Sequence, residues 1–239
     1  MGDMDDFDAV LAHQNVTNKQ IDIFCNHLLK YNSNVIHHYM GRDYFQVTLV
    51  RHPVSRALSG YFHSRTGNYC TTESTRWVET CVEFQNGIYT ALRDRNVQQL
   101  MIRDVLSPFD LLMITERFTE SLIVFMWKIG LKLTDLLYVN SKTRSPDAEL
   151  PQRKEKSFIK DVLEMNGQDL RIFELANEYL DKQIAELPPG YMDYKIVLEE
   201  MLQEVQDECP YSEDDCYWKD NGCARTCIKN WIKNNIHCL

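Results

Sequence analysis

Residues 47–61 have the sequence VTLVRHPVSRALSGY, in which an apolar strand runs directly into a helix. The β-branched and aromatic run over residues 44–50 predicts a strand buried on both faces, as in a parallel sheet. Pro53 follows, and proline suits a first helical turn because its missing N–H would be unpaired there. Apolar residues then recur at helical spacing, which predicts a helix over residues 53–63.

Arg51 lies at the carboxyl end of the predicted strand, where open α/β sheets bind their ligands. Ser59 follows about two helical turns later and is able to face the same side. A guanidinium and a hydroxyl that converge suit a phosphate group, and the helix N-terminus adds positive charge and free amides. Either residue alone could have an ordinary structural role, with Arg51 paired to an acid and Ser59 satisfied within its helix.

Strands and helices alternate along the rest of the chain. We expect strands at residues 21–25, 110–115 and 136–139, and helices within 81–106 and at 118–129, 152–164, 168–186 and 192–206. This alternation predicts an α/β fold, a three-layer domain with a mainly parallel sheet. The expected organisation is an irregular segment 1–20, the α/β domain 21–206, and a Cys-rich C-terminal appendage 207–239.

The cysteines are crowded at the C-terminal end. Five of the eight lie in the last stretch of the chain: Cys209, Cys216, Cys223, Cys227 and Cys238. In a polar tail this crowding favours a disulfide-stapled appendage, which needs an oxidising compartment. A zinc site is the alternative, and the lack of any C-x-x-C pair argues against it.

Composition and charge exclude several classes of protein. The chain has 239 residues, 44% of them hydrophobic, and a formal net charge of −9, which argues against a nucleic-acid partner. It contains no apolar run of about 18 residues that could span a membrane. The acidic start, MGDMDDFDAV, lacks the features of a signal peptide.

The strand–Arg-x-Pro–helix motif with Ser59 resembles the 3′-phosphate-binding motif of sulfotransferases that use 3′-phosphoadenosine 5′-phosphosulfate (PAPS). Further segments resemble, in the same order, the galactose 3-O-sulfotransferases; they are NHL at 26–28, MITERFTESL at 113–122, LLYVNSKTRS at 136–145 and DLRIF at 169–173. The resemblance covers about residues 20–185. Glycan 2-O-sulfotransferases share the layout more loosely.

The resemblance implies roles for individual residues in nucleotide binding. Arg51 and Ser59 would hold the 3′-phosphate of PAPS, and Lys142, Thr143 and Arg144 would close over the nucleotide. Without the resemblance, a Lys-Thr-Arg loop would be read as solvated surface.

His27 is the candidate general base, because an imidazole with a pKa near 6.5 can accept a hydroxyl proton near neutral pH. A buried histidine satisfied by a backbone carbonyl is the alternative reading. His37, His38, His52 and His63 are its rivals. Glu116 could orient a partner or cap the following helix, and we expect the cap.

By resemblance the protein would be a PAPS-dependent carbohydrate sulfotransferase of the Golgi. It would move a sulfuryl group to a galactose 3-hydroxyl of a glycolipid or glycoprotein, by positioning and charge stabilisation and without a metal. The chain also lacks a G-x-x-x-x-G-K-[ST] loop, which argues against a nucleotide kinase.

One part of the family pattern is not found. In this family a phosphate loop rich in Lys, Thr, Ser and Gly should precede Arg51. The only lysines in residues 1–50 are Lys19 and Lys30, and neither lies in a strand–loop–helix context. We therefore expect a P-loop-like domain whose first strand and phosphate loop are missing, with membrane association only through a missing N-terminal anchor. The alternative is a non-catalytic relative that binds a nucleotide or a glycan.

Overall fold

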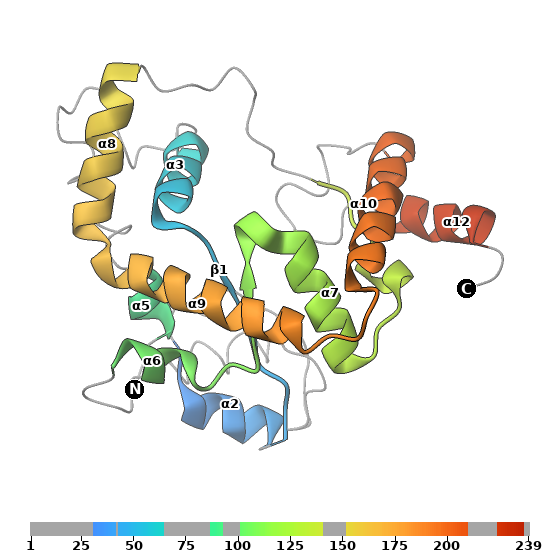
Figure 1. Ribbon diagram of the computed structural model, residues 1–239, viewed down its shortest axis with the longest axis horizontal. Helices are drawn as coiled ribbons and strands as arrows, with labels where there is room; N and C mark the ends of the chain where they lie inside the picture. The colour runs from blue at the N-terminus through green and yellow to red at the C-terminus, as the bar shows by residue number, and fades with distance from the viewer. Residues whose placement is uncertain are drawn as a thin grey trace.

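Two parallel strands lie at the centre of the structure, a computed structural model that describes residues 31–41, 43–64, 87–92, 101–140, 152–209 and 224–236. Strand β1 (Val47–Val50) pairs with β2 (Leu111–Ile114), with Val47 opposite Leu111 and Val50 opposite Ile114 (Figure 1). Parallel strands need a long crossover connection, and here helices lie between the two strands in the chain. The predicted α/β fold with a parallel sheet is confirmed.

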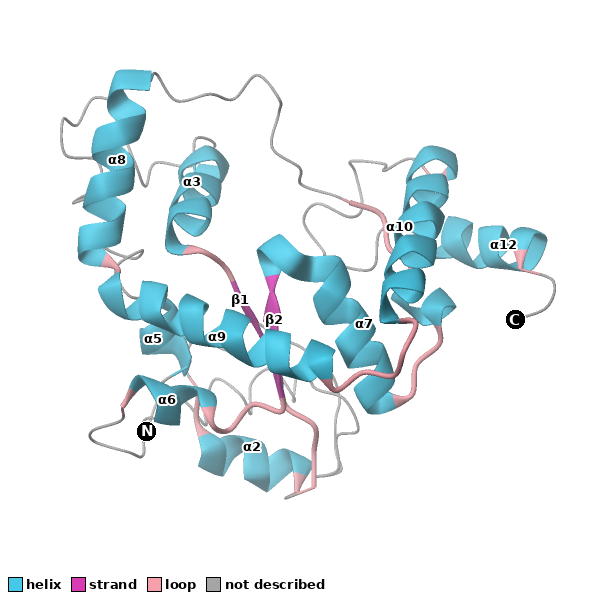
Figure 2. Cartoon of the chain, in the orientation of Figure 1, coloured by secondary structure: helices cyan, strands magenta, loops and turns pink. Residues whose placement is uncertain are grey.

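Helices surround this strand pair (Figure 2). Their bounds are α2 (Ser33–Met40), α3 (Pro53–Ser64), α5 (Gly87–Leu92), α6 (Ile102–Leu106), α7 (Phe118–Ile129), α8 (Gln152–Met165), α9 (Gly167–Ala185), α10 (Tyr191–Glu208) and α12 (Arg225–Asn235). Two 3-10 turns, η2 (Thr115–Arg117) and η3 (Leu133–Leu136), flank α7. The helices predicted from the sequence are all present, whereas α2 and α12 lie where no helix is predicted.

Helix α9 crosses the strand pair and packs on β2 (Figure 1). Its Ile172, Ala176 and Leu180 recur every four residues and are completely buried. Helix α7 packs against β2 as well. These contacts place one continuous apolar core around the sheet.

Burial differs between the two strands. All four residues of β2 are buried, and the strand lies within the range 110–115 in which a strand is predicted. In β1, Leu49 is 52% exposed, so the prediction that the strand within residues 44–50 is buried on both faces is wrong. In the described part of the chain β1 has β2 as its strand partner and packs against α9, and these contacts leave the side chain of Leu49 exposed.

The strand predicted at residues 136–139 is also wrong. Leu133–Leu136 form the turn η3, and residues 137–140 have no regular structure. The reason is local: Leu136 and Val139 anchor in two different apolar clusters, and the amide of Asn140 donates to the side chain of Gln206 on α10 at 2.7 Å. The strand predicted at 21–25 and the irregular segment 1–20 lie outside the described residues.

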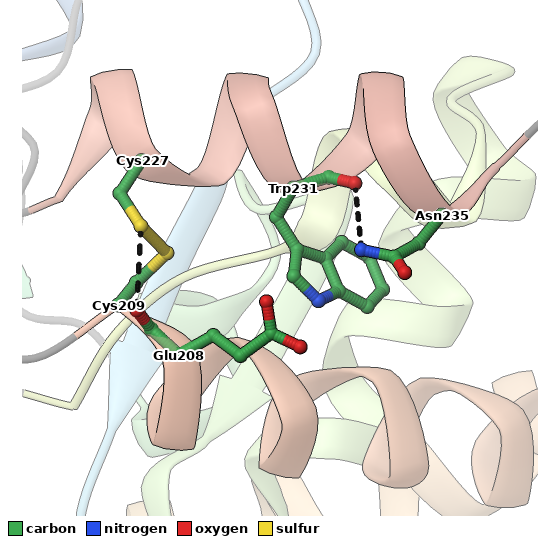
Figure 3. The surroundings of a disulfide bond; sticks show 5 residues. All are labelled: Glu208, Cys209, Cys227, Trp231 and Asn235. Carbon is green, nitrogen blue, oxygen red and sulfur yellow. Dashed lines mark hydrogen bonds between the residues drawn. A yellow bond between two sulfur atoms is a disulfide. The ribbon is translucent and has the colours of Figure 1, made fainter.

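The C-terminal appendage is joined to α10 by a disulfide bond between Cys209 and Cys227 (Figure 3). The bond connects the end of α10 to α12, and it borders a small apolar cluster that includes Ile228 and Trp231. This pair confirms the predicted use of cysteines in disulfides.

Three of the C-terminal cysteines, Cys216, Cys223 and Cys238, lie outside the described residues. Within the described ranges, His, Cys, Asp and Glu side chains nowhere gather in a group of three or more that could hold a metal ion. No helix of the described residues has the length and apolar character needed to cross a membrane.

Candidate functional site

Arg51 follows directly on the last residue of β1, as predicted. Because β1 and β2 are parallel and in register, their carboxyl ends lie side by side, and Thr115 and Glu116 follow β2 at the same edge. This is the edge at which α/β sheets bind ligands. The strand order therefore places Arg51 where the sequence analysis expects it.

Two contacts join the segments that leave this edge. The hydroxyl of Thr115 donates to the carbonyl of Val50 at 3.3 Å, and a carboxylate oxygen of Glu116 accepts the amide of His52 at 3.1 Å. The prediction that Glu116 caps the following helix is wrong: the N-cap residue of α7 is Arg117, with no side-chain cap. From the turn η2 the carboxylate of Glu116 instead reaches across to the neighbouring strand end.

The start of α3 is built by its own first residues. Nδ1 of His52 accepts the amide of Val54 at 3.3 Å, Pro53 has no amide hydrogen, and the amide of Arg56 donates to the carbonyl of His52 at 2.9 Å. The amides of His52 and Val54 are therefore occupied, and the expected free amides are not available at these two positions. Binding of an anion here therefore cannot use these two amides.

The side chain of Arg51 has unused hydrogen-bonding capacity. Its Nε is buried without a hydrogen-bond partner, and no ion pair joins it to any acid of the described residues. Buried N–H groups without partners are rare because their desolvation is costly. Ser59 is exposed on α3, and its convergence with Arg51 on one ligand stays a prediction.

A buried network of polar contacts around Arg56 and Asp169 was not predicted from the sequence. The guanidinium of Arg56 lies 2.6 Å from the completely buried carboxylate of Asp169 and donates to Asn166 at 3.1 Å. The same carboxylate accepts the amides of Ile88 and Tyr89 at 3.1 and 2.8 Å. One carboxylate thus ties α3 and α5 to the first turn of α9. The sequence offered one signal for this pair: Arg56 and Asp169 each lie in a segment that resembles the sulfotransferases, residues 47–61 and 169–173.

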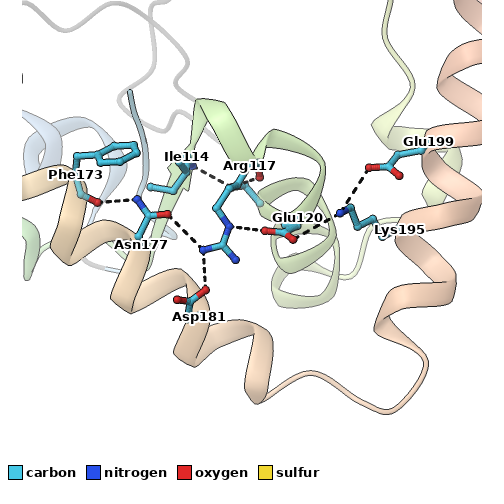
Figure 4. A network of polar contacts seen from close by, with 9 residues as sticks. Ile114, Arg117, Glu120, Phe173, Asn177, Asp181, Lys195 and Glu199 are labelled. Atoms are coloured by element: carbon cyan, nitrogen blue, oxygen red, sulfur yellow. Dashed lines mark hydrogen bonds and ion pairs between the residues drawn. The ribbon is translucent and has the colours of Figure 1, made fainter. Parts of the chain in front are cut away.

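A second network holds α7, α9 and α10 together (Figure 4). Arg117 contacts Glu120 at 2.5 Å and Asp181 at 2.6 Å, and Lys195 lies 3.6 Å from Glu120. Burial alone lowers the pKa of Arg117, but its hydrogen bonds to Asp181 and Glu120 outweigh that effect and raise the pKa. These side chains satisfy one another, which is typical of a structural network.

The remaining candidates are placed as follows. His27, Lys142, Thr143 and Arg144 lie outside the described residues, so their roles stay predictions, and the same holds for the side chain of His63. His37 and His38 are exposed on α2, which lies at the amino end of β1, away from Arg51 (Figure 1). Of the described histidines, His52 is the one adjacent to Arg51, and its ring packs edge-on against Phe173 of α9 at 5.1 Å.

Comparison with known proteins gives a match to a protein family. A model of the sulfotransferase family matches residues 5–120, a range that contains β1, Arg51, Ser59, β2 and Glu116. Among curated proteins and among solved structures, none matches the chain. The family match supports a sulfotransferase, and with it a transferase activity in general.

Proposed function

We propose that this chain, whose residues 5–120 match the sulfotransferase family, transfers a sulfuryl group from PAPS to a sugar hydroxyl. The expected acceptor is the 3-hydroxyl of galactose on a glycolipid or glycoprotein. The observation that carries the proposal is the position of Arg51 at the carboxyl end of β1, with a buried Nε that has no partner among the described residues.

Arg51 is suited to a phosphate for two physical reasons. A guanidinium presents donors in a planar fork that matches phosphate oxygens, and hydrogen bonds between charged groups are stronger than neutral ones. An anion would also provide the partner that Nε lacks. Ser59 adds a hydroxyl donor on the helix that begins two residues later. Arg51 and Ser59 would thus hold the 3′-phosphate.

The proposed reaction is an in-line transfer. The hydroxyl oxygen of the sugar forms a bond to sulfur, while the bond from sulfur to the 5′-phosphate oxygen breaks and releases adenosine 3′,5′-bisphosphate. His27 would take the proton of the sugar hydroxyl, and Lys142, Thr143 and Arg144 would close over the nucleotide. The residues of this chain would thereby orient both reactants and receive one proton.

The Golgi lumen is the proposed location. The disulfide bond between Cys209 and Cys227 supports an oxidising compartment, since such bonds are rare where thiols are kept reduced. A location in the lumen would bring the protein together with galactose-containing glycolipids and glycoproteins.

Binding of adenosine 3′,5′-bisphosphate tests the proposal directly. We expect Arg51→Ala to weaken binding by about 10- to 100-fold, the loss of a hydrogen-bonded charged group, and Arg51→Lys to restore it only in part because lysine lacks the planar fork. Isothermal titration calorimetry measures both. Arg103→Ala, a change at an exposed arginine on α6, is the matched control and should leave the affinity unchanged.

Transfer of radiolabelled sulfate from PAPS to galactose-terminated glycans completes the test, with His27→Ala alongside. Transfer that depends on Arg51 and His27 supports the enzyme. Binding that depends on Arg51 without any transfer supports a non-catalytic relative that binds the nucleotide. A wild-type protein that binds neither nucleotide nor glycan contradicts both readings.

A further inference from the structure

We infer that Thr115 and Glu116 are positioning residues for Arg51, and that together they fix the direction in which its guanidinium leaves the edge of the sheet. Neither residue is expected to touch the ligand. The inference rests on the proposed function only for the identity of that ligand, because the contacts themselves lie within the protein.

The two contacts fall on the two peptide groups that flank Arg51. The carbonyl of Val50 belongs to the peptide group before Arg51, and it accepts the hydroxyl of Thr115 at 3.3 Å. The amide of His52 belongs to the peptide group after Arg51, and it donates to the carboxylate of Glu116 at 3.1 Å. Thr115 and Glu116, which follow β2, thus contact the peptide groups on both sides of Arg51, which follows β1.

Holding both peptide groups restricts the backbone of Arg51. Peptide groups are planar, so the geometry at one residue depends on the two dihedral angles between the planes on either side. When both planes are anchored, both angles are restrained, and with them the direction of the Cα–Cβ bond. A long side chain that starts in a fixed direction loses less freedom when it binds, which favours affinity.

These contacts stand where the sheet itself no longer provides any. The paired strands end at Val50 and Ile114, so the backbone at Arg51 has no partner in the ladder. The turn η2 that supplies the contacts is itself held: the hydroxyl of Ser121 accepts the amide of Ile114 at 2.9 Å and donates to the carbonyl of Arg117 at 3.0 Å. The support for Arg51 therefore continues into the first turns of α7.

The negative charge of Glu116 makes it possible to distinguish positioning of Arg51 from a direct contribution to anion binding. The carboxylate is exposed and lies close to the expected position of an anion, where its charge opposes binding. Its contact with His52 needs only an acceptor oxygen, which a glutamine also offers. Glu116→Gln should therefore bind the nucleotide at least as tightly as the wild type, whereas Glu116→Ala should bind it more weakly.

The first experiment needs no ligand. The ¹⁵N relaxation of the Arg51 Nε–H group, followed by NMR, reports the order of this side chain. We expect it to be rigid in the wild type and in Glu116→Gln, and mobile in Glu116→Ala and in Thr115→Val. Glu200→Ala, a change at an exposed glutamate of α10, is the control. Unchanged order in both Glu116→Ala and Thr115→Val would overturn the inference.

The second experiment asks whether Glu116 acts through Arg51. We expect Glu116→Ala to weaken binding of adenosine 3′,5′-bisphosphate by about tenfold, the lower end of what the loss of an outer-shell partner costs at metal sites. With Arg51→Lys already present, the same change should have less than a twofold effect, because coupled residues are not additive. An equal effect in both backgrounds overturns the inference.

The two experiments separate this inference from the proposed function. If the wild type does not bind the nucleotide, the proposed function fails, while the relaxation of Arg51 still decides the positioning role. If Glu116→Ala does not fold, Thr115→Val provides the same test from the other peptide group. Free energies of unfolding, measured for every variant, show whether lost affinity merely follows lost stability.

Discussion

The buried charge of Asp169 shows how single residues hold the candidate site in place. Its carboxylate is completely buried, yet it has an ion pair with Arg56 and accepts two backbone amides from the start of α5. A buried charge is tolerated only when such partners are present. Since Arg56 lies in the first turn of α3, this carboxylate also fixes the helix on which Ser59 stands.

We expect Asp169→Ala to lower the free energy of unfolding by about 3 kcal/mol, because the buried ion pair with Arg56 is lost and two amides lose this acceptor. Urea unfolding followed by circular dichroism measures the change. Asp181→Ala is the matched control: Asp181 also contacts an arginine, but its side chain is 64% exposed, so its loss should cost about 1 kcal/mol or less. Equal losses for the two variants would contradict this account.

The sequence predicted the position of Arg51 at the end of a strand, but not the pairing of Arg56 with Asp169. The position of Arg51 could be predicted because a β-branched run followed by proline marks the end of a strand. Arg56 and Asp169 are far apart in the chain, and only the packing of α3 against α9 brings them together. The contacts of Thr115 with Val50 and of Glu116 with His52 could not be predicted for the same reason, since they depend on which strand lies next to β1.

At the scale of elements, the accuracy of prediction followed the length of the hydrophobic pattern. The bounds of α7 were predicted to the residue, and those of α8, α9 and α10 to within two residues, because long helices repeat their apolar face several times. The four residues 136–139 are too few to show a repeating pattern. A short apolar run does not distinguish a strand from an irregular buried segment.

Helix α12 illustrates a different limit. The sequence predicted a disulfide-stapled appendage and no helix within it, although Ile228 and Trp231, spaced three residues apart, mark a buried helical face. Both side chains join the cluster that packs beside α10. The element depends on its attachment to the rest of the protein, since a helix of this length is marginal on its own in water.

We expect loss of the bond between Cys209 and Cys227 to destabilise this attachment. The cysteines are 18 residues apart, and closing a loop of this size contributes about 3 kcal/mol in the chain-entropy view. Cys227→Ser, and the wild type in reductant, should therefore unfold at lower urea concentration and lose helical signal from α12. The oxidised wild type is the control. Identical unfolding of oxidised and reduced protein would show that packing alone holds α12.

At the scale of the whole molecule, α9 connects the core to the candidate site. It packs on the strand pair and on α3, α5, α6, α7 and α8. Its buried face supplies the centre of the apolar core, while its first turn supplies Asp169. Displacement of α9 would therefore affect both the stability of the fold and the support of α3.

The stability of the whole protein should fall at alkaline pH partly through Tyr44. Burial, followed by the neighbouring Tyr31 and Asp110, raises its pKa from 10.0 to about 12. Below pH 10 Tyr44 is protonated in both states, so its contribution is complete. Between pH 10 and 12 the unfolded chain loses this proton while the folded protein keeps it, which favours unfolding.

Comparison of Tyr44→Phe with the wild type tests this contribution. The free energy of unfolding, measured at intervals from pH 8 to 12, should fall less steeply above pH 10 in Tyr44→Phe. Tyr194→Phe, at a tyrosine on the surface of α10, provides the control for the loss of a hydroxyl. Parallel pH profiles for Tyr44→Phe and the wild type would show that Tyr44 does not titrate as described.

The contacts around Arg51 have a consequence for the order of events during synthesis. The partners of Val50 and His52 lie 65 and 64 residues further along the chain. When Arg51 is added to the growing chain, the residues that contact its two flanking peptide groups have not yet been made. If Arg51 binds an anion as we propose, a nascent chain that stops before β2 should bind that anion more weakly than the whole protein, however well α3 has already formed.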